Sequence, residues 1–225
     1  MMTNLPTVVV FDVNETLSAM SSIADRFVEV GAPEPLAKLW FASLLRDGFA
    51  LTAAGASEQF ARLGRELLRV LLHGVALDRD LEAAVEHVMA GFMSLPLHPD
   101  VVGGVQALRQ AGLRLVTLTN GSTQVAENLF DQAGIRDEFE ALLSVEDAGT
   151  WKPARPAYEY AARVCATSPT EMLLVAAHPW DIDGAARAGL STAWVNRSGG
   201  PYPEYFTAPT YVVSSVGELV PLLVG

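Results

Sequence analysis

The chain has 225 residues, half of them hydrophobic, and it carries a formal net charge of −11 at pH 7. This composition provides enough apolar surface for a sizeable core and argues against a disordered chain. The acidic balance excludes the basic face that nucleic-acid binding requires, and it opposes binding to anionic membranes.

Cysteine content and the N-terminal residues bear on the compartment. The single cysteine, Cys165, excludes an intramolecular disulfide and is typical of a reducing compartment. The opening residues MMTNLP show no basic region or cleavage-like site, so we expect no signal peptide. No apolar stretch approaches the length that crosses a bilayer. We therefore expect a cytoplasmic protein without a membrane partner.

The first predicted strand, Val8–Phe11, is a short apolar run of mostly β-branched residues that leads into Asp12. A buried strand of this kind delivers the Asp12 carboxylate to the carboxyl edge of a sheet, where open α/β sheets bind ligands. Asn14 and Thr16 follow within four residues.

The interval between Leu17 and Pro96 lacks any strand pattern. Apolar residues from Phe60 to Leu72 recur at helical spacing and predict a packing face. A helical insert placed directly after the first strand would cover the sheet edge as a cap. We expect a cap domain at 19–96, a core domain at 1–18 and 97–225, and a return hinge at 95–99. The predicted cap helices are Ser21–Val30, Glu34–Gly48, Ser57–His73 and Asp78–Met93, with breaks at 31–33, 52–55 and Gly74.

Beyond the insert, strand and helix patterns alternate to the C-terminal region. This alternation predicts a Rossmann-like, doubly wound α/β core with a parallel sheet covered on both faces. The predicted strands are Leu113–Leu118, Ala141–Val145, Met172–Ala176 and Thr192–Val195. The predicted helices are Val101–Ala111, Thr123–Ala133, Ala157–Ala166 and Ile182–Ala188.

Polar side chains follow four of the predicted strands. They are Asp12, Asn14 and Thr16 after the first strand, the run 119–122 after the second, Lys152 after the third, and the run 178–181 after the fourth. Each motif alone is typical of an ordinary turn or cap, and Trp180 could simply pack. Because the ends of parallel strands share one edge, their common order favours a site.

The chemistry of these residues is complementary. The carboxylate of Asp12 can attack carbon or phosphorus and form an ester that water then cleaves. Lys152 can hold Asp12 ionised and pair with an anionic substrate. Asp181 can orient Lys152, position a water molecule or bind a metal. Hydrogen bonds to an anion could come from Thr16, Thr119, Asn120 and the backbone amides at the start of the helix 123–133.

The order DxNxT, TNGS, lysine and WD resembles the haloacid dehalogenase superfamily of hydrolases, and within it the type II L-2-haloacid dehalogenases. The stretches 142–161, 180–190 and 193–200 are similar to that branch, and the insert matches the family's cap in place and length. The resemblance implies hydrolysis of a short 2-haloacid through an ester on Asp12, without a cofactor. The chain is also compatible with a homodimer.

The resemblance implies a role for each matching residue. Asp12 would be the nucleophile, and Thr16 would steady it. Lys152 would balance the charge of Asp12, while Asp181 would orient that lysine and the hydrolytic water. Thr119 would occupy the position of a serine that binds the substrate carboxylate, Asn120 would face the leaving halide, and Tyr158 would support Lys152.

Four positions depart from the pattern of that branch. Asn14 stands where the branch has tyrosine and phosphatases have an acid–base aspartate, and an amide cannot shuttle a proton at neutral pH. Phe41 stands where the branch has a halide-binding arginine, and the nearby Arg46 belongs to another helix face. Ala176 replaces a serine and His178 replaces an asparagine.

Two rival functions are compatible with the same residues. A Mg²⁺-dependent phosphatase could hold its metal with Asp12, the Asn14 carbonyl and Asp181, although it would need His178 as its acid. A degenerate member could bind small carboxylates or a partner protein, but the intact Asp12, Lys152 and Asp181 argue against this. We favour a dehalogenase without a metal, whose substrate contacts are Asn14, Phe41, Thr119, Asn120, Tyr158, His178 and Trp180.

Overall fold

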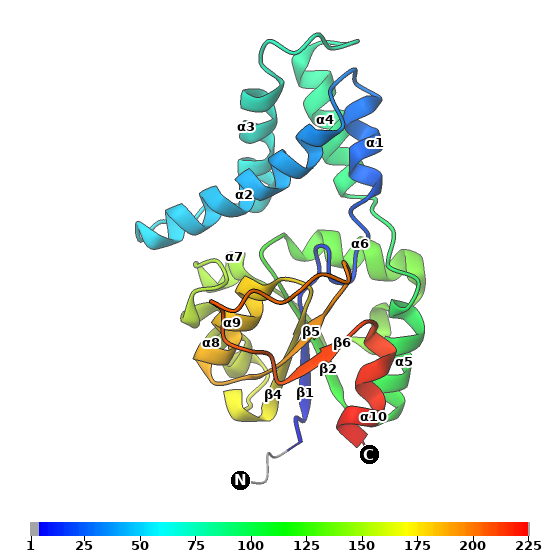
Figure 1. The fold of residues 1–225 in the computed structure, drawn as a ribbon, viewed down its shortest axis with the longest axis vertical. Coiled ribbons are helices and arrows are strands. Elements are labelled where there is room, and N and C mark those ends of the chain that lie inside the picture. Colours follow the sequence, from blue (N-terminus) through cyan, green and yellow to red (C-terminus); the bar gives the residue numbers. More distant parts are fainter. Residues whose placement is uncertain (1–4, 225) are drawn as a thin grey trace.

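Residues 5–224 are described by the computed structural model, and within them six parallel strands form one sheet in the order β3-β2-β1-β4-β5-β6 (Figure 1). The five predicted strands are confirmed to within one residue at each end. The sixth was not predicted, because it is short and its middle residue, Val212, is 59% exposed. The strands are β1 Val8–Phe11, β2 Arg114–Thr119, β3 Ala141–Ser144, β4 Met172–Ala176, β5 Ser191–Val195 and β6 Tyr211–Val213.

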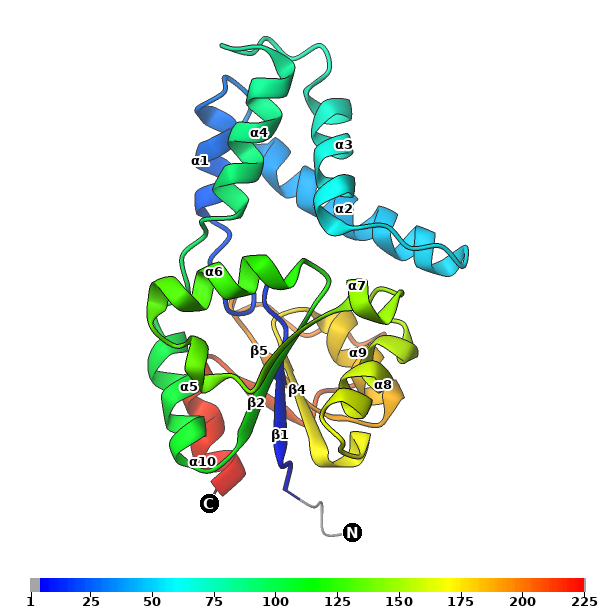
Figure 2. The same ribbon diagram turned by 180° about the vertical axis from the view of Figure 1, so that it is seen from behind.

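Helices cover both faces of this sheet, as the doubly wound prediction requires. Val8 and Val10 of β1 point into one apolar layer, and Val9 and Phe11 point into the other. One face carries α5 Val101–Gln110, α6 Thr123–Ala133 and α10 Leu219–Val224; the other carries α8 Arg155–Val164 and α9 Pro179–Ala188 (Figure 2). The short helix α7, Val145–Ala148, follows β3 directly. Both α8 and α9 begin earlier than predicted, because a proline suits the first turn of a helix.

Four further helices stand above the carboxyl end of the sheet in both views. They are α1 Ser22–Val28, α2 Pro35–Ala53, α3 Phe60–Leu72 and α4 Leu81–Phe92. The predicted break at 52–55 was placed too early, because α2 continues to Ala53 before Gly55 turns the chain with a φ of +76°. No helix within the described residues is long and apolar enough to cross a membrane.

The four upper helices pack through aromatic side chains. Trp40 of α2 donates from Nε1 to the carbonyl of Gly64, 2.9 Å away, where the absence of a side chain lets α2 and α3 approach closely. Phe92 stacks on Phe60, with ring centroids 5.0 Å apart. Phe60, Leu68 and Leu72 are buried, as the helical spacing in this stretch predicts.

Two connecting segments join these helices to the sheet. They pair as an antiparallel bridge at Ser18 and Leu97, flanked by the hydrogen bond from the Ala19 amide to the Pro96 carbonyl at 2.7 Å. The far end of α2 also contacts the sheet layer, because Gly48 lies against Trp151 and has no room for a side chain. We retain 19–96 as the proposed extent of a cap domain. These contacts hold α2 over the carboxyl edge of the sheet.

Candidate active site

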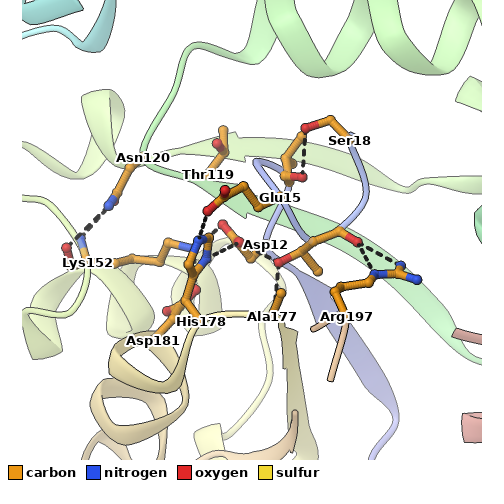
Figure 3. Close-up of polar contacts among 12 residues, drawn as sticks. Asp12, Glu15, Ser18, Thr119, Asn120, Lys152, Ala177, His178, Asp181 and Arg197 are labelled. Atoms are coloured by element: carbon orange, nitrogen blue, oxygen red, sulfur yellow. Dashed lines mark hydrogen bonds and ion pairs between the residues drawn. The ribbon is translucent and has the colours of Figure 1, made fainter. Parts of the chain in front are cut away.

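The carboxyl edge of the sheet gathers the predicted polar residues around Asp12 (Figure 3). The amide of Asp12 donates to the Val175 carbonyl at 3.0 Å, so the pairing of β1 with β4 extends one residue beyond the strand. Thr16 then connects the two loops. Its hydroxyl donates to Asp12 Oδ2 at 2.6 Å and accepts from the Ala177 amide at 2.9 Å.

Asp12 is almost completely buried and receives hydrogen bonds on both carboxylate oxygens. Lys152 Nζ donates to Oδ1 at 2.9 Å, while Thr16 and His178 Nδ1, the latter at 3.1 Å, contact Oδ2. Burial raises the pKa of Asp12, but the Lys152 ammonium and the His178 hydrogen bond outweigh it and hold that pKa well below its usual range. The carboxylate is therefore ionised at neutral pH.

Lys152 is fully buried between two carboxylates. Its Nζ donates to Asp181 Oδ2 at 2.6 Å as well as to Asp12, and Tyr158 donates to the second oxygen of Asp181 at 2.6 Å. Burial lowers the pKa of Lys152, but the charges of Asp12 and Asp181 raise it above its ordinary value. Burial raises the pKa of Asp181, and the Lys152 charge offsets part of that rise. Lys152 thus supplies a permanent positive charge.

Asn120 fixes the backbone of Lys152. Its Oδ1 accepts from the Lys152 amide at 3.0 Å, and its Nδ2 donates to the Lys152 carbonyl at 3.3 Å. Both ends of the side-chain amide are therefore directed at the backbone of the buried lysine. Its expected contact with a leaving halide remains a prediction.

His178 links Asp12 to Glu15, a residue that the sequence analysis did not identify. The ring places Nε2 2.8 Å from Glu15 Oε2, and it stacks on Trp180 with centroids 5.0 Å apart. Burial lowers the pKa of His178, but the hydrogen bonds to Asp12 and Glu15 raise it to about 9. Both ring nitrogens are then protonated at neutral pH and donate to the two carboxylates.

A group of hydrogen-bond donors lies beside Asp12, at the start of α6. Thr119 Oγ1 accepts from the Gly121 amide at 3.0 Å, which leaves its own proton available to a ligand. Asn14 Nδ2 lies beside Gly121, at 3.3 Å from where a Cβ on that glycine would stand. The Ser122 side chain does not cap α6, and the amides of a first helical turn generally lack partners within the helix. Such a set favours an anion.

Arg197 was also not identified from the sequence. Its Nη2 donates to the Thr16 carbonyl at 2.8 Å, and its Nη1 donates to Asp100 Oδ1 at 2.6 Å. Asp100 also accepts from the Val216 amide at 2.8 Å. Arg197 therefore ties the loop after β1 to the start of α5. In the sequence, the stretch 193–200 is notable only for its similarity to the type II L-2-haloacid dehalogenases.

The two aromatic residues expected at the site come from opposite sides of it. Phe41 of α2 is 6% exposed and lines a pocket of about 410 Å³ together with Glu15. Trp180 lies below the end of α2, where its ring contacts Phe49 at a centroid distance of 5.0 Å. Arg46 is exposed and pairs with Asp47, so it points away from Phe41, as the helical spacing predicts.

The donor set does not fit a divalent cation. A metal bridging Asp12 and Asp181 would occupy the place of the Lys152 ammonium, which lies 2.9 Å and 2.6 Å from their oxygens. Within residues 5–224, no group of three or more histidine, cysteine, aspartate or glutamate side chains is arranged to hold a metal ion.

Comparison with known proteins finds a matching family model and several similar sequences and structures. Residues 6–189 match the model of the haloacid dehalogenase-like hydrolases. The chain is 30% identical to haloacetate dehalogenase H-2 of Moraxella sp. (strain B), over 96% of each chain. It is 30% identical to (S)-2-haloacid dehalogenase 4A of Burkholderia cepacia, over 95% of this chain and 93% of the relative. The structure of L-2-haloacid dehalogenase from Xanthobacter autotrophicus with chloropropionic acid covalently bound is similar at a TM-score of 0.87, with 26% identity and coverage of 98% and 99%.

Proposed function

This chain belongs to the haloacid dehalogenase-like hydrolases, and from that premise we propose that it cleaves the carbon–halogen bond of short 2-haloacids by way of an ester on Asp12. The observation that carries the proposal is the buried ion pair between Asp12 and Lys152. It holds an ionised carboxylate beside a fixed cation at the end of the central strand. The names of the relatives and the covalent chloropropionic acid complex support the same reaction.

Formation of the ester begins at Asp12 Oδ1. Among the described residues, Oδ1 accepts from Lys152 only, whereas Oδ2 is engaged by both Thr16 and His178. Oδ1 therefore keeps an electron pair free for attack. Its bond to the substrate carbon forms as the carbon–halogen bond breaks, and the halide leaves with the bonding pair.

The carboxylate of the substrate needs donors, because Asp12 itself is negative. We assign it to the Thr119 hydroxyl, the Asn14 amide and the first amides of α6. Asn14 Nδ2 and Thr119 Oγ1 both lie beside Gly121, so they can hold the substrate carboxylate together. Binding through neutral donors also fits a region in which Lys152 is already shared by Asp12 and Asp181.

Hydrolysis of the ester then uses His178 and Glu15. Esterification removes the charge of Asp12, and with it one of the interactions that raise the pKa of His178. His178 can then release its Nδ1 proton to solvent, while the Glu15 carboxylate holds the other proton on Nε2. Nδ1, which faces Asp12, accepts a proton from a water molecule that attacks Asp12 Cγ, and it returns this proton to the departing 2-hydroxyacid oxygen. The proton left on the new Asp12 carboxyl group passes to Nδ1, so Asp12 is regenerated as a carboxylate with one oxygen from water.

Lys152 supplies the positive charge at Asp12, so we propose that the reaction needs no metal or other cofactor. All the groups named come from one chain, so catalysis would not depend on forming a homodimer. The reducing compartment that the lone Cys165 suggests would be the cytoplasm.

Two measurements test this function. Halide release from 2-chloropropionate should proceed with EDTA present, and phosphate release from an aryl phosphate with Mg²⁺ should not occur. A single turnover in ¹⁸O-labelled water, with enzyme in excess, should place the label in Asp12 and leave it out of the hydroxyacid. Label in the product after that one turnover would show direct attack by water and overturn the ester route.

A further inference from the structure

A pocket of about 410 Å³ lies between the cap helices and the loop after β1. It reaches from Phe41 on α2 to the segment where the chain enters α1. On the core side its wall includes Glu15, which contacts His178 and through it Asp12. The apolar side chains of the wall are Met20, Ile23, Ala24, Ala37 and Phe41.

The charged residues on the core side of this pocket already have partners. Glu15 accepts from His178, and Arg197 donates to the Thr16 carbonyl and to Asp100. The His98 ring approaches the Glu15 carbonyl with Nε2 at 3.2 Å. Because these charged groups already have partners, they need no charged ligand. The rest of the pocket surface is mainly apolar.

The remaining charged residues lie on the outer, cap side. Glu34 and Lys38 are exposed and stand four residues apart at the start of α2. This spacing puts them on the same side of the helix, where water solvates both. The pocket is thus bounded by apolar side chains on the cap side and by the already paired Glu15 and Arg197 on the core side, with Glu34 and Lys38 at its outer rim.

The volume exceeds what the alkyl group of a three-carbon acid needs. A 2-halopropionate would place a single methyl group there, about 30 Å³ on the volume of a water molecule, in a pocket of about 410 Å³. Each methylene group moved from water to an apolar wall strengthens binding by up to about fourfold. The pocket can therefore bind a substrate with a longer alkyl chain more tightly.

We propose that this pocket binds the alkyl chain of the substrate, and that the enzyme prefers 2-haloacids of about four to six carbons. The inference rests on the proposed function, because the chain must extend from a carbon held at Asp12. Phe41 forms part of the wall that would receive it, and Ala24 lies on the opposite helix α1.

The test is a chain-length series. Values of kcat/KM are measured for 2-bromoacetate, 2-bromopropionate, 2-bromobutyrate and 2-bromohexanoate. In the unmodified enzyme kcat/KM should rise about two- to fourfold per methylene group. Ala24→Leu should lower the value for the hexanoate about tenfold or more, equal to two lost methylene contacts, and change that for the propionate less than twofold. The matched control is Ala61→Leu, a half-buried alanine of α3 that does not line the pocket.

A second variant protects the test against misfolding of the first. Met20→Ala enlarges the same pocket and should shift the preference towards longer chains. Turnover of short acids with a flat or falling series, or an equal loss for all chain lengths in Ala24→Leu, would overturn the alkyl pocket and leave the dehalogenase assignment intact. Absence of halide release from every acid would instead reject the proposed function, and the pocket proposal with it.

Discussion

His178 Nδ1 lies 3.1 Å from Asp12 Oδ2, while Nε2 of the same ring lies 2.8 Å from Glu15 Oε2. The imidazole therefore bridges the buried nucleophile and a carboxylate that is 45% exposed to solvent. Because the two acids hold the proton on the ring, the charge of His178 is coupled to the charge of Asp12. This coupling has consequences for stability and for the second half of the reaction.

The stability of the protein should depend on pH through His178. Its pKa is 6.5 in the unfolded chain and about 9 in the folded protein, so the folded state binds the proton more tightly. The contribution is fully present below pH 6.5 and is lost as pH rises through 9, and it amounts to at most about 3 kcal/mol. Urea unfolding at pH 6 and pH 10 should show that the difference in unfolding free energy between wild type and His178→Asn becomes smaller at the higher pH.

A matched control for this experiment is His73→Asn, which changes an exposed histidine at the end of α3. It should change the unfolding free energy little at either pH, because the site is exposed. An equal stability difference between wild type and His178→Asn at both pH values would contradict the coupling of the ring to Asp12.

Lys152→Met should destabilise the fold as well as stop catalysis. The variant leaves Asp12 and Asp181 buried without the cation between them. Removing one member of a buried ion pair typically costs about 3–5 kcal/mol at neutral pH. Part of this loss should be recovered at acid pH, where the two carboxyl groups become protonated. Lys38→Met, at an exposed site on α2, should change stability little. A stable Lys152→Met variant at pH 7 would contradict the structure.

Asn120 offers a test between two roles. If it acts by holding the Lys152 backbone, Asn120→Ala should lower kcat by up to about 100-fold through misplacement of that lysine. The loss should then be the same for 2-chloropropionate and 2-bromopropionate. If it faces the halide, as the resemblance implies, the loss should differ between the two leaving groups. The ratio of the kcat values for the two substrates, compared between Asn120→Ala and wild type, distinguishes the two roles.

The convergence of the site was predictable because it follows from strand order. Asp12 and Lys152 are 140 residues apart, yet both follow strands of one parallel sheet and therefore meet at its carboxyl edge. Apolar runs and helical spacing were sufficient to locate the strands and the insert. Residue type then indicated which side chain was the acid and which the cation.

The unpredicted contacts depend on features that residue patterns do not contain. Glu15 has a φ of +61°, and its partner His178 is distant in sequence. Arg197 recognises a backbone carbonyl, that of Thr16, which carries no mark in the sequence. Asn120 likewise bonds to the main chain of Lys152. Each contact requires the folded loops to be placed first.

His178→Asn should separate the two chemical steps. The variant keeps a polar side chain but cannot accept the proton of the hydrolytic water, so general-base assistance worth about 10²–10⁴ in rate is lost. Halide should appear in a rapid burst of one equivalent per enzyme, followed by slow turnover. Mass spectrometry should then detect the ester on Asp12. Asp12→Asn should show neither burst nor ester, because it lacks the nucleophile.

The Glu15→Gln variant tests whether Glu15 and His178 act together in ester hydrolysis or whether the His178 ring has a purely structural role. It removes one of the hydrogen-bonding carboxylates that raise the pKa of His178. The proton should then leave the ring at lower pH, so the pH–rate profile of ester hydrolysis should shift towards acid while the halide burst is retained. A His178→Asn variant that releases halide slowly and without a burst would mean that the histidine acts before the halide departs. In that case another group would have to activate the water. Asp181 is poorly placed to do so, because its two oxygens already accept hydrogen bonds from Lys152 and Tyr158.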